Sequence, residues 1–95
     1  MSNTNASAEQ IQNMLEEAQS LIDPILTKYG CTFMQLRSKS RMSVYAVARQ
    51  EIYVRLRRQR NWSYAKIGFL FGKHHATILH SVRNWDAVHG KQDNA

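Results

Sequence analysis

The side chains with the clearest chemical potential lie in one short run in the last third of the chain. This run contains Lys73, His74, His75 and Thr77. Their side chains can form the hydrogen bonds that contacts with base edges and phosphates require. We therefore interpret residues 73–77, with Ala76 among them, as a candidate nucleic-acid contact.

The same region is poorly suited to metal binding or catalysis. His75 and His80 are five positions apart, an unfavourable spacing for two ligands on one helix face, and Cys31 is distant in sequence. No Ser/His/Asp set and no pair of carboxylates is recognisable, and acidic residues are scarce in the basic half of the chain. We expect no metal, no cofactor and no enzymatic activity.

Two short helices are predicted to position this run. Ser63 is a suitable N-cap for the first helix, and Gly72 follows its last apolar residue, where a left-handed conformation commonly ends a helix. The second helix is expected to start at about His74. Apolar residues recur at helical spacing at Ile67, Leu70 and Phe71, and again at Ile78, Leu79, Val82 and Trp85. Residues 63–89 thus predict a helix-turn-helix, whose second helix places its N-terminal residues in the major groove of DNA.

Positive charge is concentrated just before and within this motif. The net charge is +6, and residues 37–73 hold ten of the thirteen Lys and Arg residues but only one acid, Glu51. A basic block is often no more than a solvated surface. Beside a helix-turn-helix, however, it favours a polyanionic partner such as double-stranded DNA.

The remaining sequence predicts one small helical domain over residues 8–90, between a flexible segment 1–7 and a polar tail 91–95. An amphipathic helix is expected at 8–26, interrupted at Asp23-Pro24, and a second one, capped by Ser43, is expected to run to about Gln59. The single cysteine excludes an intramolecular disulfide and fits a reducing compartment. No signal peptide and no apolar run of about 20 residues is present, so we expect a cytoplasmic protein without membrane contact.

Four short motifs follow one another along the chain. They are Lys28-Tyr29, Ser38-Lys39-x-Arg41, Arg49-Gln50, and S-x-x-x-I-G-x-x-F-G followed by H-x-T-I-L-H. Together, over residues 26–88, they resemble the C-terminal DNA-binding domain of the bacterial replication initiator DnaA. The resemblance implies an all-α fold with a Trp-repressor-like helix-turn-helix, acting in the bacterial cytoplasm or nucleoid.

The resemblance also implies roles for individual residues. Arg41 falls where the family places an arginine in the minor groove, and His75 and Thr77 fall in the recognition helix. His74 stands where the family usually has an aspartate, and Ala76 replaces a base-contacting threonine, so we expect the docking mode to be kept and the target sequence to differ. Contacts with the phosphate backbone are expected from Lys39, Arg49, Gln50, Arg57 and the helix start at Ser63.

These observations predict a sequence-specific double-stranded DNA-binding protein in transcription regulation or in the control of replication, in a host, a phage or a mobile element. The alternative is an interaction or architectural protein that acts through the 8–26 helix and binds DNA weakly or non-specifically. That helix could also form a homodimer, since helix-turn-helix proteins often pair to read two half-sites, or it could complete the core of its own chain.

Overall fold

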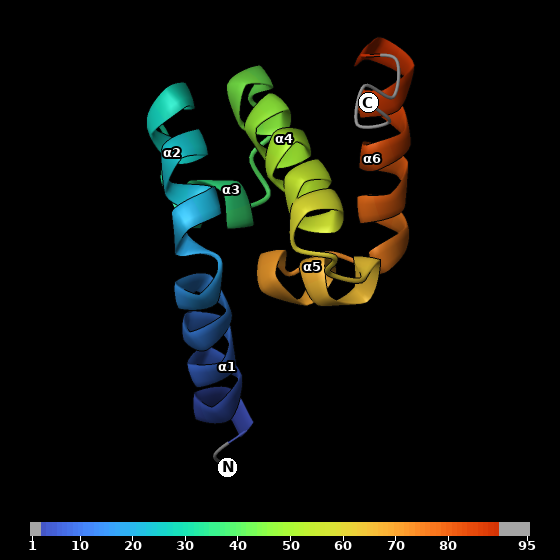
Figure 1. Ribbon diagram of the computed structural model, residues 1–95. Coiled ribbons are helices and arrows are strands. Elements are labelled where there is room, and N and C mark those ends of the chain that lie inside the picture. Colours follow the sequence, from blue (N-terminus) through green and yellow to red (C-terminus); the bar gives the residue numbers. More distant parts are fainter. Residues whose placement is uncertain (1–2, 90–95) are drawn as a thin grey trace.

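The computed structural model describes the backbone of residues 3–89 and the side chains of residues 8–89 (Figure 1). Within this range the chain forms helices and no strand, so the predicted all-α class is confirmed. The first helix starts at Asn3, ahead of the expected residue 8, and the predicted tail at 91–95 lies outside the described residues. The helices are α1 Asn3–Glu17, α2 Gln19–Tyr29, α3 Phe33–Arg37, α4 Ser43–Gln59, α5 Tyr64–Phe71 and α6 His75–His89.

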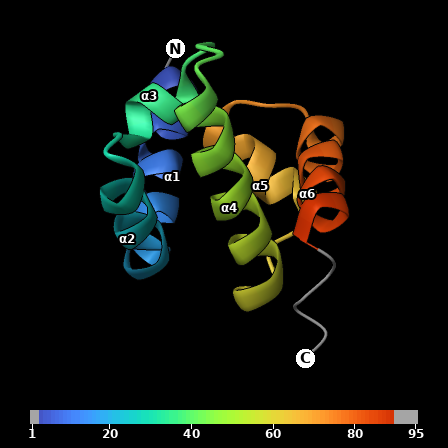
Figure 2. The ribbon, with the colours of Figure 1, turned by 90° about the horizontal axis from the view of Figure 1, so that it is seen from above.

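The central helix is α4, which lies between α2 and α6 (Figure 2). Ala48, Ile52 and Leu56 recur every four residues along α4, so they share one face and are completely buried. The ring of Phe71, at the end of α5, contacts Tyr53 of α4 at a centroid distance of 5.2 Å. Fully burying such a side chain contributes about 1.5–3 kcal/mol to stability. This shared core therefore holds the predicted helix-turn-helix against α4.

The break in the N-terminal helical segment is at Ala18, and the predicted break at Asp23-Pro24 was wrong. The Ala18 side chain is completely buried, and its carbonyl accepts the first hydrogen bonds of α2. Pro24 is accommodated inside α2 because the carbonyl that loses its partner belongs to Ser20, an exposed residue in the first turn. Arg60 donates to the Glu17 carbonyl (3.1 Å) and to Ser20 Oγ (2.7 Å), and so fixes the two helices at the break.

One buried carboxylate ties α2 to α4. Glu51 accepts hydrogen bonds from Lys28 Nζ (3.0 Å), Tyr29 Oη (2.7 Å) and Arg55 Nε (3.0 Å). Burial by itself would raise the pKa of Glu51, but these three donors outweigh it and lower the pKa below its ordinary value. The only acid of the basic block is therefore a structural residue.

Candidate nucleic-acid interface

The helix-turn-helix has the local structure that its sequence predicts. The Ser63 hydroxyl accepts the Lys66 N–H (3.0 Å) and caps α5, and Gly72 ends that helix in the left-handed region, with φ at 67°. The chain then turns back so closely that the Lys73 N–H donates to the Gly68 carbonyl (2.8 Å). A Cβ atom at Gly68 would lie 2.5 Å from the Lys73 carbonyl oxygen. Only glycine fits this position without moving the turn.

The recognition helix α6 begins at His75, and His74 is the residue that caps it. The His74 carbonyl accepts the Thr77 N–H (3.0 Å), and His74 Nδ1 accepts the Ala76 N–H (3.1 Å). Because Nδ1 accepts a backbone proton, a neutral His74 ring carries its own proton on Nε2 and presents a hydrogen-bond donor there. Its ring lies against that of His75 at a centroid distance of 4.3 Å. His75 and Thr77 are both exposed on the first turn of α6.

The basic loop between α3 and α4 is held from two sides. Arg49 of α4 donates to the carbonyls of Leu36 (2.7 Å), Ser38 (3.1 Å) and Ser40 (2.9 Å). Lys73, in the turn of the helix-turn-helix, donates to the same Ser38 carbonyl (3.2 Å). The loop that carries Lys39 and Arg41 is therefore fixed relative to α4 and to the start of α6. The predicted phosphate contact Arg49 has most of its donors engaged with this loop.

A cleft of about 380 Å³ joins the basic loop to the helix-turn-helix, and we call it the basic cleft. Burial lowers the pKa of Lys73 in this cleft, and the nearby charges of Arg49, Lys39 and Arg37 lower it further. A cation that is destabilised by other cations marks a strongly positive potential, which attracts a polyanion. The cleft is lined by Lys39, Ser40, Arg41, Ala46, Arg49, Gln50, Tyr53, Lys73, Thr77 and Ser81.

The predicted site residues thus fall into three groups. The basic cleft brings together Lys39, Arg41, Arg49, Gln50, Lys73 and Thr77. His74, His75 and Ala76 form the start of α6, outside the cleft. Arg57 and Ser63 lie apart from the cleft, near the start of α5, where Arg57 stacks on the ring of Tyr64 at 4.8 Å.

Sequence reasoning missed two residues that belong to this surface. Ser81 lines the basic cleft one helical turn after Thr77, and the i, i+4 spacing could have indicated it. Arg37 donates to the Leu70 carbonyl (2.9 Å) and contributes to the charge around Lys73. No local signal indicates that bond, because its partner is more than thirty residues away.

Among the described residues no helix is long and apolar enough to cross a membrane, and no group of three or more His, Cys, Asp or Glu residues could hold a metal ion. Paired helices, a tight turn and a basic surface beside the second helix define the class of helix-turn-helix DNA-binding domains. The chain belongs, more specifically, to the family described as bacterial dnaA protein helix-turn-helix, whose model matches residues 18–84. This finding confirms the predicted resemblance. Comparisons with curated proteins and with solved structures gave no match.

Proposed function

We propose that this protein is a sequence-specific binder of double-stranded DNA that contacts two adjacent grooves. The start of α6 enters the major groove, and Arg41 of the basic loop reaches into the neighbouring minor groove. The observation that carries this proposal is the basic cleft, in which the loop with Arg41 and the recognition helix with Thr77 share one positively charged hollow. The protein would act in the bacterial cytoplasm or nucleoid, in transcription regulation or in the control of replication.

Contacts with the phosphate backbone would fix the position of α6. Lys39, Gln50 and Arg57 supply polar side chains for this purpose, and the α5 start at Ser63 supplies backbone N–H groups. Arg49 contributes mainly by holding the loop, because its guanidinium donates to three loop carbonyls. With about five or six phosphate contacts, the logarithm of the affinity should fall with the logarithm of the salt concentration with a slope of about −5.

The bases read by α6 would depend on the polarity of His74. An aspartate at this position can only accept a hydrogen bond, for example from the amino group of cytosine. Neutral His74 offers an Nε2 proton instead, because its Nδ1 caps the helix. It would therefore favour a base with an acceptor in the major groove, such as N7 or O6 of guanine.

Selection of bound sequences from random duplex DNA tests the proposal, followed by titrations with Arg41→Ala and Thr77→Ala on the selected site. Each change should weaken binding by about 1–3 kcal/mol. Arg55→Ala is a matched control, because Arg55 pairs with Glu51 and lines neither the loop nor the basic cleft. Wild-type affinity in both variants would contradict the two-groove mode of binding.

A second candidate function is supported by α1. Its apolar residues Ile11, Met14 and Leu15 are only partly buried against the core, and α1 extends beyond the other helices (Figure 1). This surface would suit an interaction or architectural role, or a homodimer formed through α1. Equal binding to all duplexes would support such a role over specific recognition. Light scattering on the purified protein would distinguish a monomer from a dimer.

A further inference from the structure

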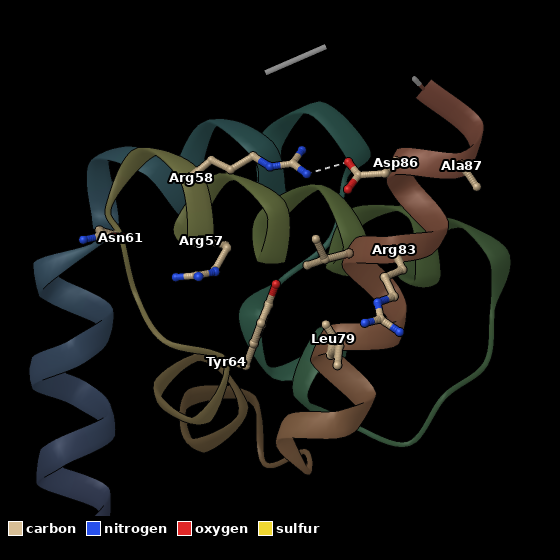
Figure 3. A pocket seen from close by; sticks show the side chains of 9 residues that line it. Arg57, Arg58, Asn61, Tyr64, Leu79, Arg83, Asp86 and Ala87 are labelled. Carbon is tan, nitrogen blue, oxygen red and sulfur yellow. Dashed lines mark hydrogen bonds and ion pairs between the residues drawn. The ribbon is translucent and has the colours of Figure 1, made fainter. Parts of the chain in front are cut away.

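A second hollow lies beside α6, formed by the end of α4, the start of α5 and the middle of α6 (Figure 3). Its volume is about 850 Å³. Arg57, Tyr64 and Arg83 line it, and Figure 3 shows Tyr64 between the two arginines. We call this hollow the arginine groove.

Within residues 8–89, the arginine groove carries two positive charges that no carboxylate of this range neutralises. Its third arginine, Arg58, forms an ion pair with Asp86 (2.5 Å), and these two charges offset each other. Arg57 and Arg83 have no carboxylate partner within residues 8–89. An anionic ligand would therefore meet two arginines across a groove in which Asp86, the one acid among the described lining residues, is already paired.

Part of this groove is organised before any ligand arrives. Arg57 donates to the Trp62 carbonyl (3.3 Å) and lies over the ring of Tyr64, whose centroid is 4.8 Å away. A guanidinium has five N–H donors, so this arrangement holds the side chain and still leaves donors for a phosphate. Arg83 is exposed, and its side chain makes no hydrogen bond to any residue between 8 and 89.

The groove and the basic cleft lie on opposite sides of α6. Thr77 and Ser81 face the basic cleft, whereas Leu79 and Arg83 face the arginine groove. Positions two apart on a helix differ by about 200° in direction, so the two pairs point to opposite sides. α6 is thus a ridge between two basic hollows. A helix in the major groove of a duplex has one phosphate backbone on each side.

We propose that the arginine groove holds the phosphate backbone of the second DNA strand, across the major groove from the strand held at the basic cleft. This inference rests on the proposed function and adds Arg83 as a backbone contact. Arg83 lies eight residues after the start of α6, about 12 Å along the helix axis. The DNA site therefore extends along the recognition helix beyond its first turn.

Titrations of Arg83→Ala on the selected duplex, over a range of salt concentrations, test the inference. We expect affinity to fall about fivefold and the salt slope to become shallower by about 0.9, as for one lost phosphate contact. Arg83→Lys should restore the slope because it restores the charge. Ethylation interference should lose a phosphate signal on the strand opposite the one that depends on Lys39.

Arg55→Ala is again the matched control, since it removes one arginine charge from a residue that lines neither hollow. Thermal melts would confirm that each variant is folded. The inference would be overturned if Arg83→Ala bound the duplex with wild-type affinity and salt slope while Arg41→Ala bound the same duplex weakly. The proposed function would then still stand. A wild-type protein that binds no duplex would refute the proposed function itself, and the groove assignment with it.

Discussion

Replacement of Gly68 by alanine tests the central geometry of the helix-turn-helix. Gly68 is buried within α5, and alanine usually stabilises a helix interior by about 1 kcal/mol relative to glycine. Here the added Cβ would lie 2.5 Å from the Lys73 carbonyl oxygen, and real Cβ contacts are essentially never shorter than 3.0 Å. The turn would have to move by at least about half an ångström. Helix propensity therefore predicts that this substitution stabilises the protein, whereas packing predicts that it destabilises it.

We expect packing to decide the outcome. Overpacking of a close-packed site costs about 1–3 kcal/mol, and the upper end applies because the opposing atom belongs to the backbone. The displaced turn also weakens the hydrogen bond from Lys73 to the Gly68 carbonyl. After the gain in propensity, a net destabilisation of about 2 kcal/mol remains, which corresponds to a Tm lower by about 8–16 °C in a domain of this size.

The same substitution should weaken DNA binding even where the variant is fully folded. The displaced turn carries Lys73 and leads directly into His74, so the start of α6 moves with it. We expect affinity to fall about tenfold, as for the loss of one base contact. Thermal melts and titrations at low temperature measure the two effects separately.

Gly30→Ala provides the control. Gly30 also has positive φ, at 66°, but a Cβ atom there would meet nothing within 4 Å. It should lower Tm through backbone strain of about 1 kcal/mol and leave DNA affinity unchanged. A higher Tm for Gly68→Ala would mean that helix propensity dominates, and the close approach of the turn would be refuted.

Three further predictions follow from particular contacts. Glu51→Gln should destabilise the protein at neutral pH. Because the pKa of Glu51 is lowered in the folded protein, the ionised carboxylate stabilises the fold fully at a pH above the ordinary value of 4.5. This stabilisation disappears as the pH falls through the folded pKa. Denaturation of both proteins from pH 7 to pH 3 measures this, and a stability difference that does not shrink in acid would contradict it. Arg49→Lys keeps the charge but loses the forked set of donors to the loop carbonyls. DNA affinity should therefore fall, and the rate of amide hydrogen exchange at residues 38–41 should rise. Unchanged affinity would show that only the charge matters. His74→Asp keeps a helix cap but replaces a hydrogen-bond donor by an acceptor. The preference for cytosine at one base pair of the selected sequence should therefore increase by about 1–3 kcal/mol. An identical selected motif would exclude His74 as a base contact.

Much of the fold could be predicted because its signals are local. The end of α4 at Gln59, the Ser63 cap and the left-handed Gly72 each depend on a few adjacent residues and on a period of 3.6. The predicted cap at Ser43 was wrong by one residue, since Ser43 is the first residue of α4 and Met42 precedes it as the N-cap. The break between α1 and α2 could not be found this way. It depends on the burial of Ala18 and on Arg60, a residue from the far end of α4. The local signal at Pro24 therefore indicated the wrong position.

The candidate site shows the same division. By itself the sequence determined the helix-turn-helix, the concentration of basic residues before it and the family, because residue types and short spacings specify these properties. Only the tertiary structure decided which side chains share a surface. In it, Arg49 donates hydrogen bonds to the carbonyls of the basic loop, and Arg57 and Arg83 line the same groove. These arrangements depend on contacts between helices far apart in the chain, and no local pattern encodes such distances.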